Sequence, residues 1–130
     1  MPRAFLIDTD TASDDAVALI MALRWPEVNV AAITVVSGNV PVEQATRNAL
    51  YTAELCGSQV PVYSGAARPL NREARYAHWY HGRDGLGDHD YPPPKRGPEA
   101  KHAVDAIIDT VSAHPGIVMV TLGPDRKSVV

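Results

Sequence analysis

An acidic turn close to the N-terminus is the part of this sequence best suited to chemistry. Its residues Asp8, Asp10, Asp14 and Asp15 lie between an apolar run and a helix-like run. Carboxylates this crowded repel one another, because unit charges about 4 Å apart interact by roughly 4 kcal/mol at an effective dielectric near ~20. We therefore expect a compensating cation. Aspartate oxygens select a hard ion such as Ca²⁺ or Mg²⁺, and no cluster of Cys or His at zinc spacing competes with that prediction.

A structural explanation accounts for part of the acidic turn. Asp14 and Asp15 could simply complement the dipole of a helix that Ser13 caps. No helix end, however, requires two further acids, Asp8 and Asp10, at the end of a buried strand. The complete cluster therefore favours a metal site or a site for phosphate chemistry.

The hydrophobic pattern around the turn predicts alternating strands and helices. Apolar and β-branched runs indicate strands, and apolar residues at helical spacing indicate helices. The predicted strands cover residues 4–7, 28–36, 60–63 and 117–122, and the predicted helices cover residues 14–24, 41–56 and 98–114. Such alternation implies right-handed crossovers and an α/β fold with an open, mostly parallel sheet and helices on both faces.

The ends of the predicted strands bring the unusual residues to one edge of the sheet. Asp8 and Asp10 end the first strand, Asn39 follows the second, and Gly123 follows the fourth. Ligands of parallel α/β folds bind at the carboxyl ends of the strands. We therefore expect the functional site at this edge.

A long segment with little apolar periodicity, residues 64–97, follows the third predicted strand. Loops of this length are uncommon inside compact domains and usually serve as lids or binding loops, with a disordered insert as the alternative. Trp79 and Tyr80 could stack on a flat ligand or pack the loop against the body. His81 could approach a ligand or simply be solvated.

Composition limits the class of protein. The chain has 130 residues, 45% of them apolar, and a net charge of −3, which is typical of one globular domain and weighs against nucleic acid as the main partner. The single cysteine, Cys56, cannot form an internal disulfide, and no basic segment followed by a long apolar run opens the chain. We expect a cytoplasmic protein with no membrane-spanning segment and a small-molecule ligand.

These residues resemble the inosine-uridine preferring nucleoside hydrolases, whose N-terminal signature is a strand running into D-x-D-x-x-x-D-D. The resemblance covers nearly the whole chain up to Pro124. Five ordered matches carry it: residues 8–15, Gly38-Asn39, Thr46-Arg47-Asn48-Ala49, the HGRDGLG segment at 81–87, and Val120-Thr121-Leu122-Gly123-Pro124. It implies a Rossmann-like nucleoside hydrolase fold.

The resemblance also implies an activity. The enzyme would use Ca²⁺ and a Ca²⁺-bound water to cleave the N-glycosidic bond of a ribonucleoside into base and ribose, in purine or pyrimidine salvage. Asp10 and Asp15 would ligate calcium by side chain, and Thr121 would ligate it by its backbone carbonyl. Asp10 would also take a proton from the water, since a metal and a positioned carboxylate together make a nucleophile near neutral pH.

Three further roles follow from the same resemblance. Asp14 and Asn39 would hold the ribose hydroxyls, and Asp8 would support the loop from behind. His81 would approach the base or its leaving nitrogen. For a full-length protein we expect a homo-oligomer.

The sequence departs from the family pattern after Pro124, where the family continues with Leu-Thr-Asn and a helix. We expect residues 1–124 to form the N-terminal part of a single nucleoside hydrolase domain. Residues 125–130 match the translation of a sequencing-library adapter, so we expect a non-family tail, with a natural short paralogue as the alternative. Because the family's remaining calcium carboxylate lies further on, we expect the fragment alone to be inactive and prone to aggregation.

Two other functions remain open at this point. A Mg²⁺-dependent haloacid-dehalogenase-type phosphotransferase also ends its first strand in two aspartates, here Asp8 and Asp10, but it wants Thr or Val where Ala12 stands. A non-catalytic module could bind ribosides without cleaving them. Base release and trapped aspartyl-phosphate distinguish these possibilities.

Overall fold

The computed structural model describes residues 2–124, which form four strands and four helices. The expectation for the tail at 125–130 lies outside these residues. In chain order the elements are β1 (Arg3–Thr9), α1 (Ser13–Arg24), β2 (Val28–Val35), α2 (Val42–Leu55), β3 (Val62–Ser64), α3 (His78–His81), α4 (Ala103–Ala113) and β4 (Val118–Thr121).

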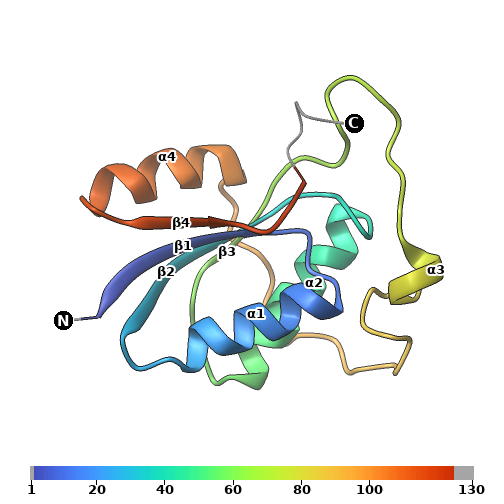
Figure 1. Cartoon of the computed structure of the whole chain (residues 1–130), viewed down its shortest axis with the longest axis horizontal. Coiled ribbons are helices and arrows are strands. Elements are labelled where there is room, and N and C mark those ends of the chain that lie inside the picture. The colour runs from blue at the N-terminus through green and yellow to red at the C-terminus, as the bar shows by residue number, and fades with distance from the viewer. Residues whose placement is uncertain (1, 125–130) are drawn as a thin grey trace.

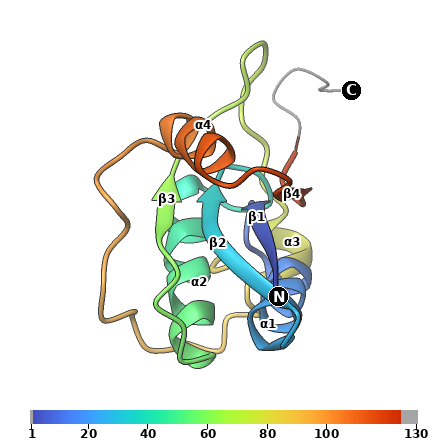
Figure 2. The ribbon, with the colours of Figure 1, turned by 90° about the vertical axis from the view of Figure 1, so that its left-hand side faces the viewer.

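The strands form one parallel sheet in the order β3-β2-β1-β4. Figures 1 and 2 show α1 and α2 on one face of the sheet and α4 on the other. The predicted parallel α/β architecture with helices on both faces is therefore confirmed. Because all strands point the same way, the acidic turn, the segment after β2 and the end of β4 meet at one edge.

The main core lies between the sheet and the helices α1 and α2. Ile33 and Val35 of β2 and Leu19 of α1 are almost completely buried there. Helix α2 presents the small residues Ala45 and Ala49 at helical spacing, so its backbone packs closely on the sheet. Central β1 is buried on both faces at Leu6 and Ile7, as expected for a parallel strand.

Two of the predicted element boundaries are wrong. The last helix begins at Ala103 and not at Pro98, because His102 caps it by accepting a hydrogen bond from the Val104 amide at Nδ1 (3.1 Å). The third strand is shifted to Val62–Ser64. The long loop contains the short helix α3, which lies beyond the carboxyl ends of the strands in Figure 1.

The helices of residues 2–124 include none that is long and apolar enough to cross a membrane.

Candidate active site

Two buried carboxylates form the centre of the site at the end of β1. Asp10 and Asp15 are only 5% and 6% exposed. The Asp15 Oδ2 atom accepts hydrogen bonds from the Thr9 hydroxyl (2.7 Å) and from the Asp10 amide (3.2 Å). These bonds join the first turn of α1 to the end of β1. They therefore fix the position of Asp15 relative to Asp10.

The segment after β2 supports Asp10 from the other side. The Asn39 amide donates to Asp10 Oδ2 at 2.8 Å. A Cβ atom built on Gly38 would lie 2.2 Å from the same oxygen, so only glycine permits this close approach. The predicted association of Asn39 with the acidic turn is therefore present, although the observed contact is made by its backbone.

The surroundings of Asp15 disfavour its ionised form. Burial, the main cause, and the neighbouring Asp10 and Asp14 raise the pKa of Asp15 to about 7, against a lowering effect of the Thr9 hydroxyl. Within residues 2–124 the structure records no ion pair between these carboxylates and a basic side chain; its ion pair joins Lys101 to Asp109. A bound cation would relieve this repulsion.

The donors present suit a hard cation only in part. Buried aspartate oxygens are the ligands that Ca²⁺ and Mg²⁺ prefer. In the described part of the chain, however, no group of three or more His, Cys, Asp or Glu side chains is arranged to hold a metal. Asp10 and Asp15 therefore offer an incomplete ligand set that needs further oxygen donors.

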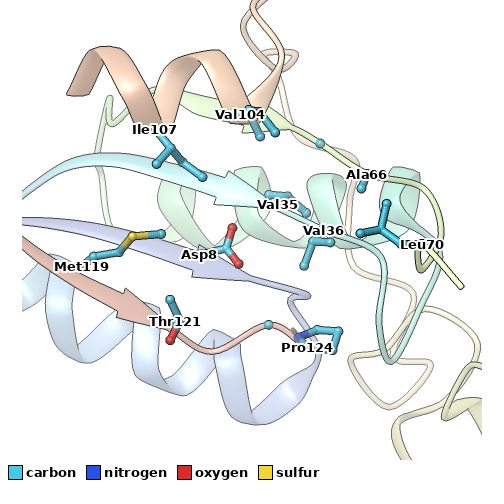
Figure 3. Close-up of a pocket in the computed structure, with 13 residues that line it drawn as sticks. Asp8, Val35, Val36, Ala66, Leu70, Val104, Ile107, Met119, Thr121 and Pro124 are labelled. Atoms are coloured by element: carbon cyan, nitrogen blue, oxygen red, sulfur yellow. The ribbon is translucent and has the colours of Figure 1, made fainter. Parts of the chain in front are cut away.

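Asp8 faces the opposite side of the sheet. Its Oδ1 atom accepts a hydrogen bond from the Thr34 hydroxyl of β2 at 2.7 Å. Burial raises the pKa of Asp8, the Thr34 hydrogen bond opposes that rise, and the charge of Asp10 adds to it. Figure 3 shows its carboxylate pointing into a pocket of about 620 Å³ between the sheet and α4. Thr121 of β4 pairs with Asp8 in the sheet and lines the same pocket.

A second pocket, of about 380 Å³, opens beside Asp10. Its walls are the segment after β2, including Asn39, and part of the long loop, including Tyr76. Its volume is within the range of about 300–1,000 Å³ that small-molecule sites occupy. Asp14 lies in the first turn of α1 and is exposed, so its carboxylate is accessible to solvent.

Ser13 and His81 meet, and this overturns the predicted role of Ser13. Ser13 is the first residue of α1 and not its cap; the N-cap residue is Ala12, which has no side-chain capping bond. The Ser13 hydroxyl instead lies 2.9 Å from Nδ1 of His81. His81 is 9% exposed, so the alternative of a solvated histidine is wrong. The long loop is thereby brought against the acidic turn.

Trp79 and Tyr80, on the other hand, do not pack the loop against the body. They are 86% and 71% exposed. Their rings meet edge to face, with centroids 5.7 Å apart. Both remain available for stacking on a ligand.

Asn48 of α2 is a site residue to which the sequence assigned no role. It is 3% exposed, and its side-chain amide donates to the backbone carbonyls of Thr11 (2.9 Å) and Asp84 (2.6 Å). The signal in the sequence was a polar residue on the apolar face of a helix, next to Ala49 and one turn from Ala45. A polar residue at such a position needs partners, and here they come from two distant segments.

Comparison with known proteins agrees with this geometry. The profile of the inosine-uridine preferring nucleoside hydrolase family matches residues 5–125. Uridine nucleosidase 1 of Arabidopsis thaliana is 41% identical over 122 residues, which are 92% of this chain and 36% of the relative. The inosine-uridine preferring nucleoside hydrolase of Leishmania major is 42% identical over 116 residues, 88% of this chain and 37% of the relative.

A solved plant nucleoside hydrolase has the same fold. It superimposes with a TM-score of 0.89 at 40% identity, covering 95% of this chain and 40% of the plant protein. The chain thus spans about two fifths of the length of the relatives that it matches.

Proposed function

Since the chain belongs to the inosine-uridine preferring nucleoside hydrolase family, we propose that it carries part of a Ca²⁺-dependent site that hydrolyses the N-glycosidic bond of ribonucleosides. The observation that supports this most directly is the pair of buried carboxylates, Asp10 and Asp15, without a basic partner in the described residues. They would hold the ion together with the backbone carbonyl of Thr121 and with donors that residues 2–124 do not supply.

Asp10 is the proposed general base. A bound Ca²⁺ would supply Lewis acidity that lowers the pKa of a water. Asp10 takes a proton from the attacking water, whose oxygen bonds to C1′ of the ribose while the bond from C1′ to the base breaks. The departing base keeps the bonding electrons and takes a proton from solvent water. Asp10 then returns to solvent the proton that it took, so that one water in total is added across the broken bond. The backbone N–H of Asn39 donates to the Asp10 carboxylate and orients it for this step.

The surrounding carboxylates also suit the charge of the transition state. Breaking a glycosidic bond places positive charge on the sugar ring, as in an oxocarbenium ion, and fixed negative groups stabilise that charge. Asp14 and the side chain of Asn39 would hold the ribose hydroxyls beside the 380 Å³ pocket. Trp79 and Tyr80 would stack on the base. A protein of this activity would serve nucleoside salvage in the cytoplasm.

Membership of the family leaves the haloacid-dehalogenase alternative without support, because the match covers the acidic turn on which that alternative depended. A riboside-binding module without catalysis stays a second candidate. The observation in its favour is that residues 2–124 provide an incomplete set of metal-ligating side chains.

The experiment combines ion binding with an assay of ribose release. Tb³⁺ is a luminescent probe for Ca²⁺ sites, and the chain should bind it and release it to excess Ca²⁺. Because we expect the 130-residue chain alone to be inactive, inosine, uridine and cytidine are then incubated with a full-length version of the protein in Ca²⁺ or in chelator. Ribose release that stops when the chelator is added supports the proposal. Release at the same rate in chelator contradicts it. Riboside binding without release of base would favour the binding module.

A further inference from the structure

Asn48 joins three segments that are far apart in the sequence. Its side-chain nitrogen donates to the carbonyl of Thr11 in the acidic turn and to the carbonyl of Asp84 in the long loop. Its side-chain oxygen accepts from Gln44 Nε2 at 2.9 Å, one turn earlier in α2. Both donors and the acceptor of a 3%-exposed amide are thus occupied.

Asn48 is hydrogen-bonded to residues 82–88 of the long loop, and this segment is also held by hydrogen bonds within itself. The Asp84 Oδ1 atom accepts from the amides of Leu86 (2.8 Å) and Asp88 (2.9 Å). Gly85 has φ +78°, and a Cβ atom there would lie 3.1 Å from Asn48 Nδ2 and 3.0 Å from Val40 Cγ1. Glycine at this position therefore lets the loop approach the Asn48 amide.

A second attachment lies at the start of this segment. His81, whose carbonyl accepts from the Gly87 amide at 2.8 Å, also reaches the Ser13 hydroxyl at 2.9 Å. The loop is therefore attached to the acidic turn at two points: Asp84 is joined to Thr11 through Asn48, and His81 is bonded to Ser13. Asp10 and Asp15 lie on either side of these two anchor points in the sequence.

We propose that Asn48 is a positioning residue that fastens residues 81–88 onto the acidic turn and thereby fixes Asp10 and Asp15 for cation binding. The inference rests on the proposed function for the identity of the ligand. Its physical basis is that the Thr11 carbonyl is buried, so losing the amide leaves an unpaired acceptor and frees the turn to move. Substituting residues that orient metal ligands in this way commonly lowers the metal affinity by about 10–100-fold.

The test compares Asn48→Ala with Thr52→Val in the 130-residue chain. Thr52 is the matched control: it lies one turn later in α2, is 2% exposed, and its hydroxyl donates to the Asn48 backbone carbonyl without reaching the loop. Asn48→Ala should weaken Tb³⁺ binding about tenfold and accelerate hydrogen exchange at the amides of Leu86, Gly87 and Asp88. Thr52→Val should change neither quantity.

A second pair of variants approaches the contact from the loop and guards against a helix variant that fails to fold. Gly85→Ala pushes a methyl group toward Asn48, whereas Gly57→Ala meets nothing within 4 Å although its φ, +67°, is also in the left-handed region. Gly85→Ala should weaken Tb³⁺ binding and Gly57→Ala should not.

Unchanged Tb³⁺ affinity in both Asn48→Ala and Gly85→Ala would overturn the inference. A wild-type chain that binds no Tb³⁺ would instead contradict the proposed function. In that case hydrogen exchange still decides whether Asn48 fastens the loop, since exchange that stays slow in Asn48→Ala also overturns the inference.

Discussion

Helices α2 and α4 cover opposite faces of the same sheet, and α2 is more completely buried than α4. Helix α2 buries most of its sheet-facing side, including Ala45, Ala49 and Leu50. Helix α4 buries Ala103 and Ala106, while three of its larger apolar residues stay 43–59% exposed: Val104, Ile108 and Val111.

The same difference extends to the polar residues. On the α1 and α2 side, Asp10, Asp15 and Asn48 are buried and cross-linked by hydrogen bonds. On the α4 side, Asp8 lines a mostly apolar pocket, and the edge strand β4 pairs only with β1 among residues 2–124. The contrast teaches that the acidic turn is positioned by contacts within this chain, whereas α4 leaves the apolar side chains of Val104, Ile108 and Val111 exposed.

The largest expected effect separates the two helices directly. Leu50→Ala removes a side chain that is 2% exposed in the core and should lower the free energy of unfolding by about 2–5 kcal/mol. Ile108→Ala removes one that is 59% exposed and should change it by less than about 0.5 kcal/mol. Urea unfolding followed by circular dichroism measures both. Equal losses would mean that the outer face of α4 is covered in solution, for example by a second copy of the chain.

The next prediction concerns the acidic turn. Asp15→Asn keeps the shape of the side chain and can still accept from Thr9, but it removes one proposed ligand charge. Tb³⁺ binding should weaken by more than about tenfold, and the metal-free protein should become more stable at pH 8, because a crowded carboxylate is gone. Luminescence titration and thermal unfolding check the two effects. Asp109→Asn, on the exposed side of α4, is the control and should leave Tb³⁺ affinity unchanged.

The pH dependence of stability tests the same carboxylates without a mutation. The pKa of Asp15 is about 7 in the folded protein against an ordinary value of 3.8, so between these values the folded state binds the additional proton. The free energy of unfolding of the metal-free chain should therefore fall as pH rises from about 4 to 7. The raised pKa of Asp8 acts in the same direction.

Calcium provides the control for this pH profile, because a bound cation favours the ionised carboxylates. Ca²⁺ at about 100 times its Kd should raise the free energy of unfolding, measured by thermal unfolding, by about 2.7 kcal/mol, and it should flatten the decline with pH. If the free energy of unfolding in chelator increases from pH 4 to 7, the folded state does not disfavour ionisation of these carboxylates.

The smallest expected effect on stability comes from the exposed stripe of α4. Replacing Ile108 and Val111 by serine should change the free energy of unfolding by less than about 0.5 kcal/mol per residue, since both are largely exposed. Self-association, measured by light scattering, should decrease, because less apolar surface is presented. If the serine substitutions leave self-association unchanged, the surface responsible for it is not this part of α4.

The sequence by itself determined the alternation of strands and helices and the place of the acidic turn. Hydrophobic periodicity is a local property, and the carboxyl ends of parallel strands must meet at one edge, so Asp8, Asp10 and Asn39 could be assigned to that edge in advance. The family signature in residues 8–15 and 81–87 added the activity as an expectation.

Only the tertiary structure decided which partners the polar side chains take. Ser13 has the position of a helix cap, but a hydroxyl can bond equally well to a distant group, and His81, 68 residues away, is that group. Asn48 stands out in the sequence as a polar residue on an apolar helix face, but its spacing did not reveal that its partners would be Thr11 and Asp84. Helix α4 begins at Ala103, after the cap His102, and not at Pro98. Hydrogen bonds between remote segments depend on how the chain packs, and sequence spacing does not encode that packing.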